Sequence, residues 1–352
     1  MPPQAALVNL SPAELSFLRS ALTQSPPLRL DATKGPRDFR SMRAEYDVLP
    51  TANGSARIAL EDGTEALVGV KAEVERTPHP PLLREQHGLD GSHGGHSSDP
   101  NPLGQNAWVE VSVELPGFRD DDALPVFLAS MLTESLLASG ALKDSLYINP
   151  RFHWKLFVDI LLLSPPLSYP LALLSMTTHL ALLTAHLPAL KSDKDEDPLF
   201  DDDWAAASPL YPHSSTRHTP PVIILAIAVG PNIIFDPCKE ELAVADAVLA
   251  IACTSTSSAA SSKILSIRTI DPPSHLTPPA VPNSMNSATG GAAPESSAHA
   301  LTLRELLATT GVWTPPRGGM KRGLVSHVAK MVVEKGGVAD DVIGALAAIE
   351  VG

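Results

Sequence analysis

The sequence is poor in cysteine and in basic residues. Only two of its 352 residues are cysteines, Cys238 and Cys253, and they form no CxxC motif. This excludes a disulfide framework and a cysteine zinc site, and it is typical of a reducing compartment. Lys and Arg number 26 against 39 acidic residues, a formal net charge of -13. Such a chain should not bind nucleic acid unaided through a broad basic face, because neutralising phosphates needs clustered Lys and Arg.

A leader sequence and a membrane span are not expected. The N-terminal residues MPPQAALVNLSPAEL have no basic region followed by an apolar run and a cleavage site, so they predict no secretory signal. Residues 160–190 contain no Asp, Glu, Lys or Arg, but Pro165, Pro166 and Pro170 break the segment, and two histidines interrupt the rest, His179 and His186. A spanning helix needs about 20 predominantly apolar residues in sequence. The segment therefore predicts a buried strand, a proline turn and a buried helix.

Common catalytic and metal motifs are also missing. The sequence contains no GxSxG, Walker A, GxGxxG or HExxH pattern. A Gly-rich stretch holds four histidines whose spacing fits no finger or helical metal site, so we interpret it as a disordered loop: His79, His87, His93 and His96. Asp193, Asp195 and Asp197 imitate the start of a calcium loop. Pro198 and Trp204 stand where that loop needs Gly and Glu, which rejects the site.

Alternating apolar residues are the strongest pattern present. They predict three strands at residues 44–49, 55–60 and 66–74, joined by hairpin turns at Asn53-Gly54 and Asp62-Gly63. The alternation resumes from Trp108 to Leu115. Two tight turns between short alternating runs predict an antiparallel sheet.

Helical and buried segments complete the pattern. Ser11 and Glu14 form a capping box that opens a helix at Pro12, and acids at residues 120–122 open a second helix. Further elements are expected in this order: a strand at 147–163, a helix at 171–187, strands at 222–229 and 233–235, an ambiguous segment at 240–252, and helices at 301–308 and 324–334. The order predicts an α+β fold of mixed sheets covered by helices.

Three stretches interrupt these elements. Residues 77–105 and 191–219 are predicted loop insertions. Residues 254–300 are rich in Ser, Pro and Ala and are predicted to be mostly disordered, apart from an apolar island at 264–270. We therefore divide the chain into a domain of residues 1–253, this segment, and a C-terminal helical segment of residues 301–352.

The strand motifs resemble a known family. RDFRSMRAEYDVLPTANGSARIALEDGTEALVGVKAEV (residues 37–74) is similar to the opening of the RNase PH-like domain, which has the ribosomal protein S5 domain 2-like fold. WVEVSVELPGF (108–118) and YINPRFHWKLFVDILLL (147–163) resemble the next strands of one branch. That branch is the forty-two type of ribosomal RNA-processing protein, a core-ring subunit of the eukaryotic RNA exosome. The resemblance covers about residues 11–253.

The resemblance implies partners and a cellular role. Six RNase PH-like subunits, paired as three heterodimers, would form a ring around a channel that threads RNA. Cap subunits with RNA-binding domains would join it, and no membrane would be involved. The implied role is 3′-to-5′ RNA processing and degradation, including rRNA maturation and mRNA turnover, in the nucleus, nucleolus and cytoplasm.

Active members of the family are expected to hold a divalent metal with two aspartates spaced six apart. Counted from Asp236, these positions fall on Leu242 and Val248, which offer no oxygen ligand. The family also implies a basic phosphate cradle, but residues 123–140 contain no Lys or Arg. We therefore predict a non-catalytic subunit with no catalytic residue, no metal and no cofactor.

Two alternative functions stay open. An active phosphate-dependent 3′-to-5′ exoribonuclease would take its metal ligands from Asp236, Glu240, Glu241 or Asp246. An RNA-binding adaptor would use the Ser/Pro-rich segment and terminal basic residues: Arg317, Lys321 and Arg322.

Isolated basic residues are the remaining candidates for RNA contacts. Arg119, Lys143 and Arg151 are predicted to face the channel, although ordinary solvated charges are the simpler interpretation. Three arginines near the first strand are open between partner ion pairs and RNA contacts: Arg37, Arg40 and Arg43. His179 and His186 lie on an apolar helix and are interpreted as core or interface residues.

Overall fold

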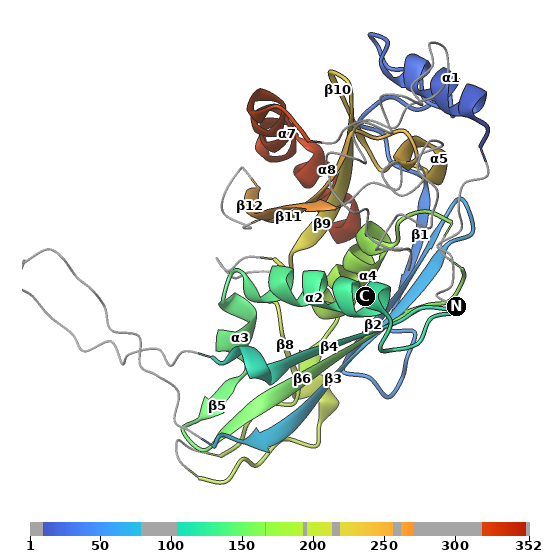
Figure 1. The fold of residues 1–352 in the computed structure, drawn as a ribbon. Helices are drawn as coiled ribbons and strands as arrows, with labels where there is room; N and C mark the ends of the chain where they lie inside the picture. Colours follow the sequence, from blue (N-terminus) through green and yellow to red (C-terminus); the bar gives the residue numbers. More distant parts are fainter. Residues whose placement is uncertain are drawn as a thin grey trace, which may run out of the picture.

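The computed structural model describes seven stretches of the chain (Figure 1): residues 10–78, 104–165, 167–192, 196–212, 219–255, 262–270 and 319–349. Several sequence-based predictions fall outside them: the four-histidine stretch, Asp193 and Asp195, the helix at 301–308, Arg317, and most of residues 254–300. The division of the chain into the segments 1–253, 254–300 and 301–352 stays a prediction.

The first sheet contains most of the predicted alternating strands. Its order is β1 (Met42–Tyr46), β2 (Gly54–Leu60), β3 (Glu65–Arg76), β6 (Phe152–Leu162) and β4 (Val109–Glu114), with β5 (Tyr147–Asn149) paired to β6. Most neighbours are antiparallel as predicted, but β4 runs parallel to β6. A purely antiparallel sheet was therefore wrong for β4, whose connection to β6 passes through α2 (Ala123–Leu137) and α3 (Ala141–Ser145).

The second sheet is antiparallel and largely buried. Its order is β10 (Asn232–Phe235), β9 (Val222–Val229), β11 (Ala247–Thr254) and β12 (Lys263–Ile270). Every residue of β9 and β11 is buried, which explains their continuous apolar sequence. The ambiguous segment at 240–252 divides into the short helix α5 (Lys239–Leu242) and β11, and the apolar island forms β12.

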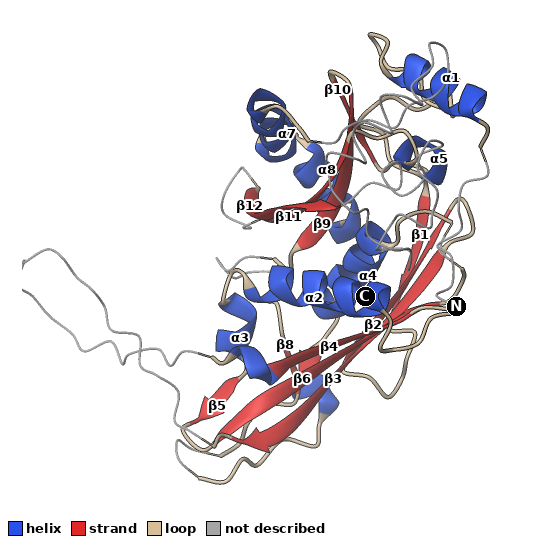
Figure 2. Ribbon diagram, viewed as in Figure 1, coloured by secondary structure: helices blue, strands red, loops and turns tan. Residues whose placement is uncertain are grey.

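Helix α4 (Leu171–Leu183) lies between the two sheets (Figure 2). All of its residues are buried, and it contacts β2, β3 and β9. The stretch at 160–190 without Asp, Glu, Lys or Arg thus contains a core helix after a proline turn, as predicted. Within the described stretches, no helix has the length and apolar character needed to cross a membrane.

The remaining helices cover the edges of the core. Helix α1 (Pro12–Leu22) has the predicted capping box between Ser11 and Glu14. Helix α7 (Arg322–Val333) contacts β12, and α8 (Val338–Ala347) contacts β11. The sequence pattern predicted α7 but not α8. Short elements complete the described structure: the 3-10 helices η1 (Asn106–Trp108) and η2 (Trp204–Ala206) and the strands β7 (His186–Leu187) and β8 (Ser208–Pro209).

The predicted hairpin turn at Asn53-Gly54 is wrong. The longer loop of residues 47–53 joins β1 to β2, and Gly54 is already the first residue of β2. Asn53 instead bridges two segments: its Oδ1 accepts from the Ala72 amide at 2.9 Å, and its Nδ2 donates to the His186 carbonyl at 3.0 Å. A Cβ on Gly54 would lie 2.5 Å from the Ala181 carbonyl oxygen. Close packing against α4 and the segment that follows it therefore explains why Asn and Gly occupy positions 53 and 54.

Candidate functional site

The two positions where metal-binding aspartates were expected lie in the core. Leu242 ends α5 and Val248 belongs to β11, and their exposed fractions are 4% and 2%. Val248 pairs with Ile227 on one side and Ile270 on the other. Aliphatic side chains between apolar strands cannot ligate a cation. Any metal site in this region would need the neighbouring acids instead.

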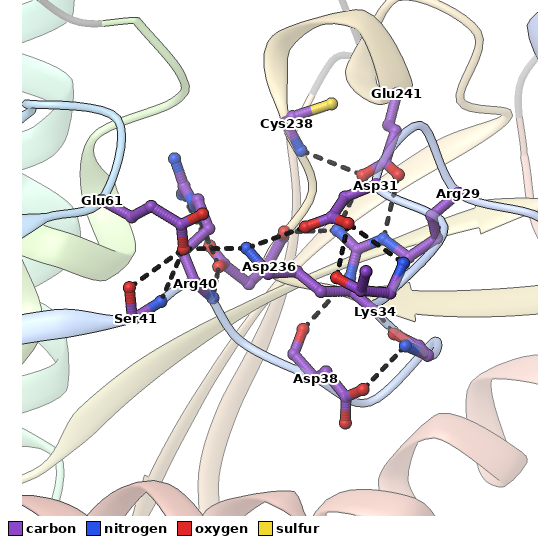
Figure 3. Close-up of polar contacts among 12 residues, drawn as sticks. Arg29, Asp31, Lys34, Asp38, Arg40, Ser41, Glu61, Asp236, Cys238 and Glu241 are labelled. Carbon is purple, nitrogen blue, oxygen red and sulfur yellow. Dashed lines mark hydrogen bonds and ion pairs between the residues drawn. The ribbon is translucent and has the colours of Figure 1, made fainter.

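Asp236 is the first of these acids and is bound by Arg40 (Figure 3). It follows β10 with a positive φ of 46°. Its Oδ1 lies 2.6 Å from Nη2 of Arg40, and its Oδ2 accepts from the Arg40 amide at 2.7 Å. The same guanidinium donates through Nη1 to Asp62 and Ser168. Arg40 therefore ties the loop after β10 to the β2–β3 turn and to the segment before α4.

Glu241 is the second acid, and Arg29 binds it in a bidentate pair. Nε and Nη2 of Arg29 each lie 2.9 Å from a different carboxylate oxygen. The two side chains are only 5% and 1% exposed. Arg29 also donates to the Asp236 carbonyl at 2.9 Å and to the Asp38 carbonyl at 3.1 Å. Burial alone would lower the pKa of Arg29, but the hydrogen bonds and charge of Glu241 raise it overall.

Asp246 is the third acid, and Arg19 of α1 binds it. Nη2 of Arg19 lies 2.8 Å from Oδ1, and the Gly230 amide donates to Oδ2 at 2.6 Å. Arg19 also donates to the Val244 carbonyl at 3.1 Å. We call Arg19–Asp246, Arg29–Glu241 and Arg40–Asp236 the three Arg–acid pairs. In each, an arginine of residues 19–40 neutralises an acid that follows β10, lies in α5 or precedes β11.

The three Arg–acid pairs change what these acids can do. A metal would have to displace a guanidinium from each carboxylate, and for the buried Arg29 this would leave a desolvated cation without its partner. In the part of the chain that the structure describes, no group of three or more His, Cys, Asp or Glu side chains has metal-binding geometry. The arrangement fastens the N-terminal segment to the second sheet.

Both cysteines lie in this half of the molecule as free thiols. Burial, with a smaller contribution from Glu241, raises the pKa of Cys238 to about 12. Burial, with a smaller contribution from Asp340, likewise raises the pKa of Cys253 to about 12. Neither thiol is activated as a nucleophile, because the thiolate is the reactive form.

The helix expected to cradle phosphate begins with acids. Asp122 is the N-cap of α2, and its Oδ2 accepts from the Arg119 amide at 2.8 Å. Asp121 forms an ion pair with the Arg119 side chain at 3.1 Å. Carboxylates already complement the helix dipole here, so a phosphate would meet charge of its own sign. This end of α2 is unsuited to hold an attacking phosphate.

The predicted RNA-contact residues lie on different elements, each with its own neighbour. Arg119 precedes α2 and its side chain is 81% exposed. Lys143 of α3 donates to the Asn106 side chain at 3.1 Å. Arg151, just before β6, lies 3.3 Å from Asp197. All three remain accessible from solvent.

The arginines near β1 form ion pairs within the chain. Arg37 pairs with Glu334 of the segment after α7 at 3.1 Å, and Arg43 pairs with Glu45 at 2.6 Å. His179 is a core residue, with its Nδ1 2.7 Å from the Pro220 carbonyl. Sequence analysis missed Arg19 and Arg29, because single basic residues more than 200 positions from their acids carry no local signal.

Comparisons with known proteins give consistent matches. Residues 38–188 match the RNase PH model described as "3' exoribonuclease family, domain 1". Exosome complex component RRP42 of Saccharomyces cerevisiae is 31% identical over 246 residues, covering 68% of this chain and 79% of that protein. Exosome complex component rrp42 of Schizosaccharomyces pombe is 30% identical over 260 residues, covering 69% and 78%.

Solved structures are also similar. A chain of the Archaeoglobus fulgidus exosome with RNA bound to the active site has a TM-score of 0.49 at 23% identity, covering 73% of this chain and 87% of that one. A chain of an archaeal exosome core has a TM-score of 0.48 at 22% identity, covering 73% and 84%.

Proposed function

Because the chain belongs to the 3′ exoribonuclease (RNase PH) family, and within it to the family of exosome complex component RRP42, we propose that it is a structural subunit of an RNA exosome core ring. The observation that carries this proposal is the 31% identity extending over 79% of the Saccharomyces cerevisiae protein. The two sheets with a helix layer between them agree with the α+β, RNase PH-like fold expected from the sequence.

In this role the chain assembles with other RNase PH-like subunits into a six-membered ring. Cap subunits with RNA-binding domains join the ring, and RNA passes through the shared channel. Arg119, Lys143 and Arg151 are proposed channel contacts, because their side chains reach solvent. The complex serves 3′-to-5′ processing and degradation of RNA in the nucleus, including the nucleolus, and in the cytoplasm.

We propose that the subunit itself is not a nuclease. Leu242 and Val248 stand where metal-binding aspartates are expected, and the three Arg–acid pairs occupy the nearby carboxylates. Acids also begin α2 where phosphate would bind. Both observations count against the alternative of an active phosphorolytic enzyme.

Assembly is tested by co-expressing the full chain with the RNase PH-like subunits of the same organism. We expect stable co-purification and an unfolding temperature that rises in the complex, because partners that bind the folded chain stabilise it. A monomer that retains none of these subunits would overturn the structural role.

Activity is tested on single-stranded RNA with inorganic phosphate and Mg²⁺. We expect no nucleoside diphosphate to be released by the purified chain. Phosphorolysis that disappears in Asp246→Asn, with the fold intact, would instead support the nuclease alternative.

A further inference from the structure

Two guanidinium groups lie over one aromatic ring at the start of β6. Cζ of Arg76 is 5.9 Å and Cζ of Arg151 is 5.6 Å from the ring centroid of Phe152. Nearby, Nζ of Lys155 lies 5.5 Å from the Phe157 ring. These are the cation–π contacts found across the described stretches, and all involve residues 151–157 of the β6 region. We call Arg76, Arg151 and Phe152 the stacking cluster.

The backbone around the stacking cluster is held in place before any ligand binds. Oδ1 of Asn149 accepts from the amides of Arg151 and Phe152 at 2.9 and 2.8 Å. The Thr77 amide donates to the Arg151 carbonyl at 2.8 Å. Arg76 and Phe152 are direct cross-strand partners of β3 and β6. Little conformational entropy is therefore lost when a ligand uses this surface.

A buried aromatic pair supports the next residue of the strand. The rings of Trp108 and His153 stack with centroids 4.5 Å apart and planes 16° apart. His153 is also 2.9 Å from the Thr77 hydroxyl through Nδ1. The stacking cluster thus stands on a rigid base, while Arg76 and Arg151 are exposed and Phe152 is half-buried.

We propose that the stacking cluster binds unpaired bases of single-stranded RNA. Guanidinium planes and aromatic rings are the groups on which splayed bases stack, and this stacking needs no particular sequence. Arg151 can also bind a backbone phosphate, because its Asp197 partner is 81% exposed and a surface pair of this kind is weak. The inference rests on the proposed function, which places the chain in a complex that handles RNA.

The aromatic ring favours RNA over an acidic peptide. A carboxylate-bearing partner would use the charge and the forked N–H donors of the arginines, but it would not need the ring of Phe152. A stacked base needs the ring as well as the flat guanidinium groups. Replacing Phe152 by Leu therefore separates the two ligands, since it keeps both arginines and removes the ring.

The test measures binding of a fluorescently labelled single-stranded oligouridine to the full-length chain. We expect Arg76→Lys, Arg151→Lys and Phe152→Leu each to weaken binding by about fivefold or more, the range seen for loss of a stacked base. The matched control is Arg43→Lys, an 82% exposed arginine of β1 in the same sheet, which should leave the affinity unchanged. Photo-crosslinking with 5-iodouridine RNA should map to residues 76 or 151–152.

Several outcomes would overturn the stacking site. Unchanged affinity in Arg76→Lys and Arg151→Lys would do so, as would equal losses in the Arg43→Lys control. A loss in Arg76→Ala without a loss in Arg76→Lys would also overturn it, because the charge of residue 76 alone would then account for binding. If Phe152→Leu impairs folding, seen as a lower unfolding temperature, the two lysine variants decide the question.

Co-purification of the same variants with ring subunits separates this proposal from the previous one. Normal assembly with unaltered RNA binding would refute only the stacking site. Loss of assembly by the wild-type chain would refute only the ring role, while the stacking site would still stand on the binding data.

Discussion

Arg29 is the most deeply buried arginine at the candidate site, and it tests how the N-terminal segment is held. Removing one partner of a buried ion pair leaves the other charge uncompensated, which typically costs about 3–5 kcal/mol. We predict that Arg29→Met lowers the free energy of unfolding by about that amount, measured as a shift of the urea midpoint. Glu241 would then lose both of its guanidinium bonds.

A double variant and a surface control make this prediction specific. Arg29→Met combined with Glu241→Leu should recover much of the loss, because both buried charges are gone. Arg43→Ala removes an exposed pair with Glu45 and should change stability by less than about 1 kcal/mol. Equal effects of Arg29→Met and Arg43→Ala would contradict the importance given to the buried pair.

His179 links stability to pH. The Pro220 carbonyl accepts a hydrogen bond from Nδ1, so the fold holds the neutral tautomer. Burial lowers the pKa of His179 from 6.5 to about 4. Between these pH values the unfolded chain binds more protons at this residue than the folded chain. The contribution of His179 to the free energy of unfolding is therefore fully present above pH 6.5 and is lost as the pH drops towards 4.

We therefore predict that the free energy of unfolding declines below pH 6.5 with a contribution of up to about 1.4 kcal/mol per pH unit from this group. Urea midpoints measured across the range should show a shallower decline in His179→Gln. Burial also lowers the pKa of His153, so His153→Gln serves as a comparison with the same sign. An unchanged pH profile in His179→Gln would refute the assignment.

Residue-level prediction succeeded where the signal was local and failed where it was not. The acids Asp236, Glu241 and Asp246 stand out in the sequence as the groups near the expected metal site. Arg19 and Arg29 do not stand out, and Arg40 stood out only as a basic residue without an assigned partner, because the folded chain brings these arginines to acids about 200 positions away. A carboxylate in sequence therefore indicates a ligand or an ion pair equally well.

At the scale of elements, the contact of β2 with α4 fixes how the first sheet lies on the core. A Cβ at Gly54 would lie 2.5 Å from the Ala181 carbonyl oxygen and 2.6 Å from Cα of Ala185. Backbone atoms cannot move aside without shifting α4. We predict that Gly54→Ala lowers the free energy of unfolding by about 3 kcal/mol, measured by urea denaturation.

The same substitution elsewhere should have the opposite sign. Gly344 lies on the exposed face of α8, where an added Cβ would meet no neighbouring atom within 4 Å. Gly344→Ala should stabilise the chain by about 0.5–1 kcal/mol through helix propensity. A stabilising or neutral Gly54→Ala would show that α4 is not packed tightly against β2.

Helices and strands were predictable where the sequence carried a clear local pattern, such as alternating apolar residues or a capping box. Alternation located β2 and β3, and a capping box located α1. The parallel direction of β4 was not predictable, because a parallel and an antiparallel strand share the same alternation. The pattern at 240–252 was ambiguous because α5 and β11 are both short and buried.

For the whole molecule, the net charge of -13 limits how RNA is bound. Each phosphate neutralised on a single strand contributes about −0.7 to the slope of log affinity against log salt. With at most two phosphate contacts from the stacking cluster, we predict a slope no steeper than about −1.4, so that a fourfold rise in salt weakens binding by at most about sevenfold.

This slope also discriminates between the functions considered from the sequence. An RNA-binding adaptor with a broad basic surface would make many phosphate contacts, and its slope would be several times steeper. Because the chain has 39 acidic residues against 26 Lys and Arg, a basic RNA-binding surface would have to be confined to a small part of it. A titration of oligouridine binding between about 50 and 200 mM salt measures the slope, and Arg151→Ala should reduce it by about 0.7. A steep slope that survives this substitution would place the RNA contacts outside the stacking cluster and favour the adaptor function.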